Sequence, residues 1–267
     1  MQLFSRIKNK IYQLLNVCLL GITVKDKIKI FITGLIVSVV YKIHKKNNIF
    51  FTLKLCYRSK PFTIHVHYPT DFAVIHEVFI DREYDKFQNL NPGIIFDLGS
   101  NVGASVKFYN ILYPNANVFS FEPNPEIFKW LQENTKDNSN NHINNCAISS
   151  KTDKLDFYID SDSNLASSLQ QRKQSVKKIS VDSYTLKDLL DKIEINKIDL
   201  LKIDVEGAEA EIFKIFDCRL ISNIIGELHV DIAKIEPSKF ANLLVGHKVH
   251  FDKINNSRYI FWTELVV

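Results

Sequence analysis

From residue 93 to the end of the chain, apolar segments with the spacing of strands alternate with segments that have helical spacing. Strands are predicted at 94–97, 118–121, 143–148, 155–159, 198–203, 224–230, 248–251 and 259–264. Helices are predicted between them at 102–112, 125–134, 186–193, 208–216 and 237–244. This alternation is typical of an α/β fold, in which a mostly parallel sheet carries helices on both faces and binds ligands at the carboxyl ends of its strands.

The chain before this alternation has two parts. Residues 1–46 have apolar residues at helical spacing, and residues 47–90 contain two strand-like runs that predict a hairpin, followed by a short helix. We therefore expect a helical N-terminal segment at 1–46, a lead-in at 47–90 and the α/β domain at 91–267. The longest uncharged run of its second apolar segment, 28–43, is the twelve residues 30–41, fewer than the roughly 20 that span a bilayer. An interfacial or buried helix is therefore expected there.

Charge separates the first 60 residues from the rest. They contain twelve Lys or Arg residues and one acid, a formal charge of +11, whereas the remaining 207 residues carry −7. An apolar and basic segment can lie on an anionic membrane, and we expect such peripheral contact through residues 1–46. Packing on the domain or pairing in a dimer is the alternative, and nothing fixes the oligomeric state. Nucleic acid is not expected as a partner, because the aromatic residues do not interleave with the basic ones as in a stacking platform.

The four cysteines lie 38 or more residues apart and form no CxxC pair. This spacing excludes a zinc module and a dense disulfide framework, so we expect reduced thiols and a cytoplasmic protein, peripheral at the inner face of the membrane. The apolar stretch at 11–24 is followed by no small-residue cleavage site, so no signal peptide is expected.

The first candidate site is the turn Asp97-Leu98-Gly99-Ser100-Asn101-Val102-Gly103, which follows an apolar strand and precedes a helix. Its glycines allow a tight turn and the close approach of a ligand. The carboxylate of Asp97 would repel a pyrophosphate and favours a ligand with a cationic group, such as the amino group of S-adenosylmethionine (SAM). The GxGxxG pattern of nicotinamide enzymes is absent.

Two further predicted strands are each followed directly by acidic residues. Glu122 follows the strand 118–121, where it can accept hydrogen bonds from both hydroxyls of a ribose. Asp204 and Glu206 follow the strand 198–203, and Glu209 lies just beyond Gly207. Clustered acids repel one another unless cations, hydrogen bonds or a ligand offset the repulsion, so a site is expected. Solvated acids and helix capping by Glu206, with Glu209 exposed, are the alternatives.

These segments together resemble the FkbM family of SAM-dependent methyltransferases. The resemblance rests on residues 97–103, on 121–125 and above all on 202–209, covers about residues 70–230, and extends weakly to 145–149 and 166–169. It implies a class I, Rossmann-like methyltransferase fold with a mostly parallel seven-stranded sheet. The implied reaction is O-methylation, commonly of sugar hydroxyls in surface glycans or glycolipids, or of secondary metabolites. It also implies that SAM is held at its methionine end by Asp97, Gly99, Asn101 and Gly103, at its ribose by Glu122 and near its adenine by Ala147.

Methyl transfer from a sulfonium to a hydroxyl requires alignment of the two groups and removal of a proton. His229 is the candidate base, because the strand 224–230 places it on one face with Glu227. A half-buried histidine bonded to backbone is the alternative. Asp204 and Glu206 are alternative bases, or could orient the acceptor and the SAM amine. These two acids and His229 could hold a divalent metal, but substrate binding also explains the acids, so no metal ligand is assigned.

Two other functions compete with the methyltransferase. A nucleotide-dependent reductase would need a Tyr-x-x-x-Lys pair after the glycine turn, whereas the pair Tyr41 and Lys45 precedes it. A non-catalytic glycan- or membrane-binding protein could keep the fold without turnover. The acids Asp97, Glu122 and Asp204 favour SAM binding, and an enzyme is the prediction.

Overall fold

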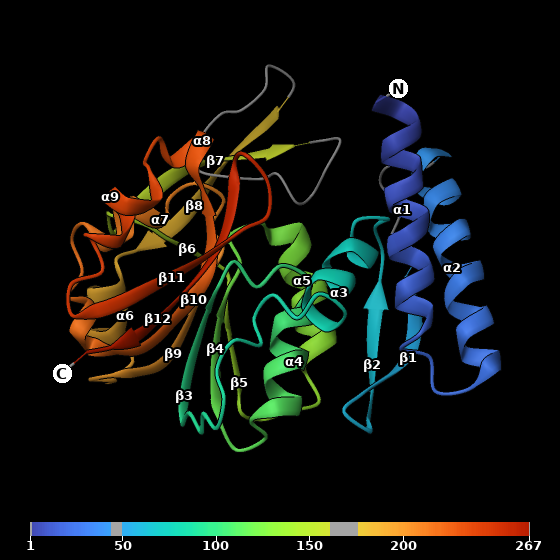
Figure 1. The fold of residues 1–267 in the computed structure, drawn as a ribbon, viewed down its shortest axis with the longest axis horizontal. Helices are drawn as coiled ribbons and strands as arrows, with labels where there is room; N and C mark the ends of the chain where they lie inside the picture. Colours follow the sequence, from blue (N-terminus) through green and yellow to red (C-terminus); the bar gives the residue numbers. More distant parts are fainter. Residues whose placement is uncertain (1, 44–49, 161–175, 267) are drawn as a thin grey trace.

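The computed structural model describes residues 2–43, 50–160 and 176–266 (Figure 1). The weakly matching segment 166–169 lies outside these residues. The central element is a seven-stranded sheet of order β11-β12-β10-β9-β3-β4-β5. Its strands are β3 (Ile94–Leu98), β4 (Asn117–Phe121), β5 (Asn141–Asn144), β9 (Ile198–Ile203), β10 (Ile221–His229), β11 (His247–Lys253) and β12 (Arg258–Leu265). Neighbouring strands from β5 to β10 are parallel, and β12 is antiparallel to both β10 and β11. This confirms the predicted fold class.

Helices cover both faces of the sheet and bury a separate apolar core on each. The first core joins α3 (Asp71–Phe79), α4 (Ala104–Leu112) and α5 (Pro125–Thr135) to the face that carries Ile95 and Val118. The second joins α6 (Leu186–Lys192), α7 (Glu209–Phe213) and α9 (Pro237–Ala241) to the face that carries Phe96 and Leu201. A short α8 (Val230–Ala233) follows β10. Because successive strand side chains point to opposite faces, adjacent apolar residues such as Ile95 and Phe96 serve both cores.

One predicted strand is wrong. Instead of a single strand at 143–148, the chain forms β5 in the main sheet and then β6 (Ala147–Ile148), which pairs with β8 (Val176–Tyr184). The side-chain amide of Asn145 donates to the carbonyl oxygens of Glu122 (2.7 Å) and Pro123 (3.2 Å), which ties the chain down where it leaves the main sheet. With β7 (Asp153–Asp160), these strands form a second sheet of order β6-β8-β7, and the sequence did not predict β8.

The N-terminal helices and the hairpin form as predicted. Helices α1 (Gln2–Cys18) and α2 (Val24–Ile43) lie side by side at one end of the molecule, next to the hairpin β1 (Phe51–Tyr57) and β2 (Lys60–Val66) (Figure 1). Leu14 and Val17 of α1 and Ile30 of α2 belong to the first core. A Cβ on Gly34 would lie 2.4 Å from the Leu14 side chain, so this glycine lets the two helices approach closely. Within the described residues, we find no helix long and apolar enough to cross a membrane.

Candidate active site

An open cavity lies at the carboxyl ends of β3, β4, β9 and β10. Its empty volume is about 1230 Å³ when the open solvent at its mouth is included. The residues of the predicted motifs that line it are Gly99, Asn101, Glu122, Ala147, Asp204, Glu206, Glu227 and His229. The lead-in and β12 contribute Glu77, Tyr84 and Arg258. The cavity therefore joins four strand ends that are distant in the sequence.

The glycine turn after β3 is held against β9. Gly99 has a positive φ of 79°, and a Cβ there would lie 1.9 Å from the carbonyl oxygen of Asp204. Lys202 of β9 donates to the carbonyl oxygen of Gly99 at 2.7 Å, and its Nζ lies 3.1 Å from Asp97 Oδ1. Lys202 thus holds the turn in place, although it lies in a strand about a hundred residues later in the sequence.

Asp97 and Gly103 do not line the cavity. Asp97 is fully buried, forms the ion pair with Lys202 and accepts a 2.5 Å hydrogen bond from Ser105 Oγ. Gly103 precedes the first residue of α4 with a φ of 90°. Both residues support the turn in this structure, whereas Gly99 and Asn101 lie at the cavity surface.

Glu122 and Ala147 mark the other side of the turn. The two carboxylate oxygens of Glu122 accept hydrogen bonds from the backbone N–H groups of Asn124 (2.8 Å) and Asn101 (3.1 Å). Burial raises the pKa of Glu122 to about 7, against the lowering effect of these two bonds. Each oxygen keeps a lone pair for a ligand hydroxyl. Ala147 lies beside Ile148 and Phe157 in an apolar part of the cavity wall.

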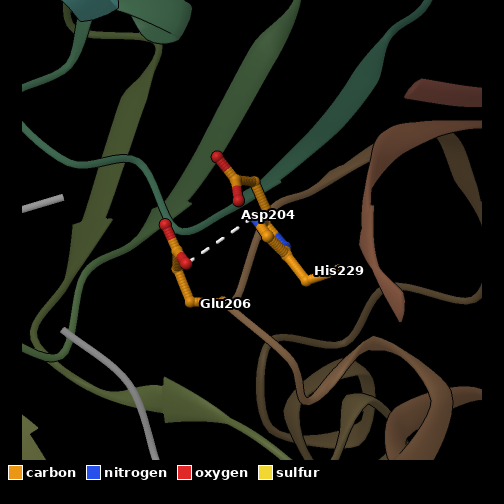
Figure 2. Close-up of side chains that lie close together, drawn as sticks. All are labelled: Asp204, Glu206 and His229. Atoms are coloured by element: carbon orange, nitrogen blue, oxygen red, sulfur yellow. Dashed lines mark ion pairs between the residues drawn. The ribbon is translucent and has the colours of Figure 1, made fainter. Parts of the chain in front are cut away.

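Asp204, Glu206 and His229 meet at the ends of β9 and β10 (Figure 2). His229 Nε2 lies 3.6 Å from Glu206 Oε2, and its Nδ1 lies 3.3 Å from Oε1 of the fully buried Glu209. Glu209, for which the sequence left both a site residue and an exposed helix residue open, is thus a partner of the predicted base. Glu206 has a positive φ of 57°, a backbone conformation that costs a non-glycine residue about 1–2 kcal/mol.

The carboxylates around His229 change its acid–base behaviour. Burial alone would lower the pKa of its imidazole, but the hydrogen bond to Glu209 and the charges of Glu206 and Asp204 outweigh burial and raise it to about 10. His229 is therefore a cation at neutral pH in this arrangement, and a cation cannot accept the proton of a hydroxyl. This charge weighs against His229 as an unassisted base.

A second cluster of charged residues, centred on Arg258, forms another part of the cavity wall. The sequence did not predict it. Arg258 pairs with Glu227 (2.5 Å), Glu83 (2.6 Å) and Glu77 (3.3 Å). Burial raises the pKa of Glu77 to about 7 despite the nearby Arg258 charge. The hydroxyl of Tyr84 donates to Asp204 Oδ2 at 3.4 Å. No local motif marks Arg258 or Tyr84, because each reaches the site only through the tertiary fold.

Comparison with known proteins gives sequence matches to methyltransferases. Residues 97–251, more than half of the chain, match the sequence model of the methyltransferase FkbM domain. Methyltransferase 1 of Beauveria bassiana is 27% identical over 176 residues, which cover 57% of this chain and 71% of that protein. The 2-O-methyltransferase NoeI of Sinorhizobium fredii is 26% identical over 175 residues, with 60% and 70% covered. The hexuronic acid methyltransferase AglP of Haloferax volcanii is 29% identical over 154 residues, with 57% and 61% covered.

Proposed function

The chain belongs to the FkbM family of SAM-dependent methyltransferases, and we propose that it methylates a sugar hydroxyl in a surface glycan or glycolipid. The observation that carries the proposal is that one cavity is shared by two groups of residues. The glycine turn and Glu122 lie on one side of it, and the cluster of Asp204, Glu206 and His229 lies on the other. One similar protein, named a hexuronic acid methyltransferase, supports a sugar acceptor, and another, named a 2-O-methyltransferase, supports transfer to oxygen.

The residues on the turn side of the cavity fit SAM. Glu122 would accept hydrogen bonds from the ribose hydroxyls, and the apolar wall at Ala147 and Phe157 suits an adenine ring. Gly99 and Asn101 would face the methionine end. Asp97 would not touch SAM but would hold Lys202, which in turn holds the glycine turn in place. When bound, SAM supplies a methyl group on a positively charged sulfur.

The opposite side of the cavity would receive the acceptor. The residues there orient the hydroxyl in line with the methyl carbon and the sulfur. As the acceptor oxygen bonds to the methyl carbon, the electron pair of the broken carbon–sulfur bond stays on sulfur. The hydroxyl proton leaves through the two carboxylates of the cluster, Asp204 and Glu206. Glu206, with 23% of its side chain exposed, connects this cluster to solvent.

The test is methyl transfer itself. We expect the full chain, incubated with isotope-labelled SAM and glycans or glycolipids from the source cell, to add one labelled methyl group to a glycan, detected by mass spectrometry. Asp204→Asn should abolish the transfer, and Asp252→Asn, a change at an exposed surface acid, should not. Label found only on nucleic acid or protein would contradict the sugar assignment.

We also propose that α1 and α2 dock this enzyme on an anionic membrane, where lipid-linked glycans are found. One side of the helix pair packs into the first core, whereas the other exposes large apolar side chains. These are Ile7, Ile11, Tyr12 and Leu15 on α1, Leu19 just after it, and Val24, Ile28, Phe31, Ile32, Leu35, Ile36 and Val39 on α2. Exposed lysines accompany them at positions 8, 10, 25 and 29. In a dimer formed through this surface, the lysines of the two copies would repel one another, whereas anionic lipid headgroups attract them.

Liposome flotation tests the docking. Removing the helices would expose the first core, so the informative variant instead replaces Ile28, Ile32 and Leu35 with Gln. We expect the full chain to float with anionic vesicles and this variant to stay behind. The matched control replaces Ile215, Val245 and Ile254, which are exposed elsewhere on the molecule, and should float. Equal flotation of the two variants, or dimerisation of the full chain without flotation, would contradict the proposal.

A further inference from the structure

The side chains of Asp204, Glu206 and His229 converge in a way that suits a metal ion. Each offers one ligand atom, and these three atoms lie within 4.8 Å of one another (Figure 2). Asp204 and Glu206 follow the end of β9 and His229 ends the neighbouring parallel strand β10, in which Gly226 is in register with Ile203 of β9. The sheet therefore brings the strand end that leads to the two carboxylates next to the strand end that carries the imidazole.

The buried carboxylate of Glu209 orients the imidazole of His229. His229 Nδ1 faces Glu209 Oε1 at 3.3 Å, and that same carboxylate oxygen accepts a 3.0 Å hydrogen bond from the backbone N–H of Gly207. Nε2 is therefore the nitrogen that faces the cavity, beside Glu206 and Glu227. A histidine that binds a metal commonly donates its other ring N–H to a buried carboxylate, which fixes the tautomer and the ring orientation.

Asp204 supplies an independent observation. Its Oδ1 atom is buried and accepts no hydrogen bond from any residue that the structure describes, while Oδ2 is held by Tyr84 at 3.4 Å. A buried carboxylate oxygen without a partner is energetically costly, and a bound ion is one of the features that can satisfy it. One oxygen of Asp204 is thus held by the protein, and the other is left for a ligand.

The neighbouring side-chain cations are already paired. Arg258 is shared among Glu77, Glu83 and Glu227, and Lys202 pairs with Asp97. Two carboxylates and one imidazole form a ligand set with mostly oxygen donors, which suits Mg²⁺ or Mn²⁺ better than a thiophilic metal.

We propose that Asp204, Glu206 and His229 bind a divalent cation of the Mg²⁺ or Mn²⁺ type, with Glu209 as the residue that positions His229. The proposed role of the ion rests on the proposed methyl transfer. There, the acceptor hydroxyl would bind the cation, which favours release of its proton to water at the open mouth before the oxygen attacks the methyl carbon. His229 then acts as a neutral ligand.

Metal binding can be measured without turnover. We expect the full chain, titrated with Mn²⁺ in the absence of SAM, to remove about one equivalent of the free-ion electron paramagnetic resonance signal, and Mg²⁺ to compete. Asp204→Asn and His229→Gln should each weaken binding at least tenfold, and Glu209→Gln about 10–100-fold through loss of orientation. Glu211→Gln is the matched control, because Glu211 lies on the same helix, is half exposed and pairs with Lys214. Circular dichroism checks that each variant is folded.

Three outcomes would overturn parts of the proposal separately. No Mn²⁺ binding at millimolar concentration, or equal binding by all four variants, would remove the metal site. Methyl transfer that continues unchanged in a chelator would remove the catalytic role of the ion and leave the proposed function in place. Mn²⁺ binding without methyl transfer to any glycan would keep the site and remove the proposed function.

Discussion

Replacing Lys202 with Met should strongly destabilise the protein, because it leaves a buried charge without its partner. The Lys202 side chain is 2% exposed and that of Asp97 is fully buried, and their charged atoms lie 3.1 Å apart. Without Lys202, Asp97 keeps the Ser105 hydrogen bond and the carbonyl oxygen of Gly99 loses a 2.7 Å bond. Breaking one side of such a pair costs about 3–5 kcal/mol, a large part of the stability of an ordinary domain.

Urea unfolding followed by circular dichroism measures this loss. Lys214→Met is the control, because the Lys214–Glu211 pair is about half exposed and should contribute less than about 1 kcal/mol. The double variant Asp97→Asn, Lys202→Met removes both charges and should be more stable than Lys202→Met alone. A Lys202→Met loss no larger than that of Lys214→Met, or a double variant less stable than Lys202→Met, would refute the assignment of Lys202 as the ionic support of the turn.

Three further perturbations follow from the same contacts. Gly99→Ala should lower the melting temperature and abolish SAM binding, because its Cβ would lie 1.9 Å from the Asp204 carbonyl oxygen, whereas Gly93→Ala, with its nearest atom at 3.4 Å, should do neither. SAM binding measured by calorimetry should be roughly tenfold weaker near pH 6 than near pH 8, because ribose hydroxyls favour the ionised form of Glu122, whose pKa of about 7 then falls on binding. Glu122→Gln should remove that dependence, and a variant that keeps it would show that another group titrates. Arg258→Met should lower the melting temperature far more than Arg219→Met, since Arg258 pairs with three carboxylates in the cavity wall and Arg219 pairs with one on the surface; equal shifts would contradict this.

The sequence predicted the elements that depend on local pattern. Apolar strands that end in Asp97, Glu122 and Asp204 place those acids near one sheet edge, because parallel strands share their carboxyl ends. The break between β5 and β6 could not be predicted, since it depends on hydrogen bonds from Asn145 to a distant loop.

The contacts that the side chains of the site make with one another could not be predicted from the sequence either. Asp97 was expected to face the cofactor, but in the fold Lys202 and Ser105 occupy its carboxylate. The sequence left open whether Glu209 belongs to the site or is exposed, and in the fold it is buried next to His229. Arg258 lies in a strand about thirty residues after Glu227, and only the antiparallel pairing of β12 with β10 brings the two together.

Calorimetry with SAM, paired with a turnover assay, tests most directly whether the cavity is one site with a cofactor side and an acceptor side. We predict that the full chain binds SAM, that Glu122→Ala loses binding, and that Asp204→Asn keeps binding but loses methyl transfer. Absence of binding by the full chain at millimolar SAM, or loss of binding in Asp204→Asn with retention in Glu122→Ala, would contradict that division of the cavity.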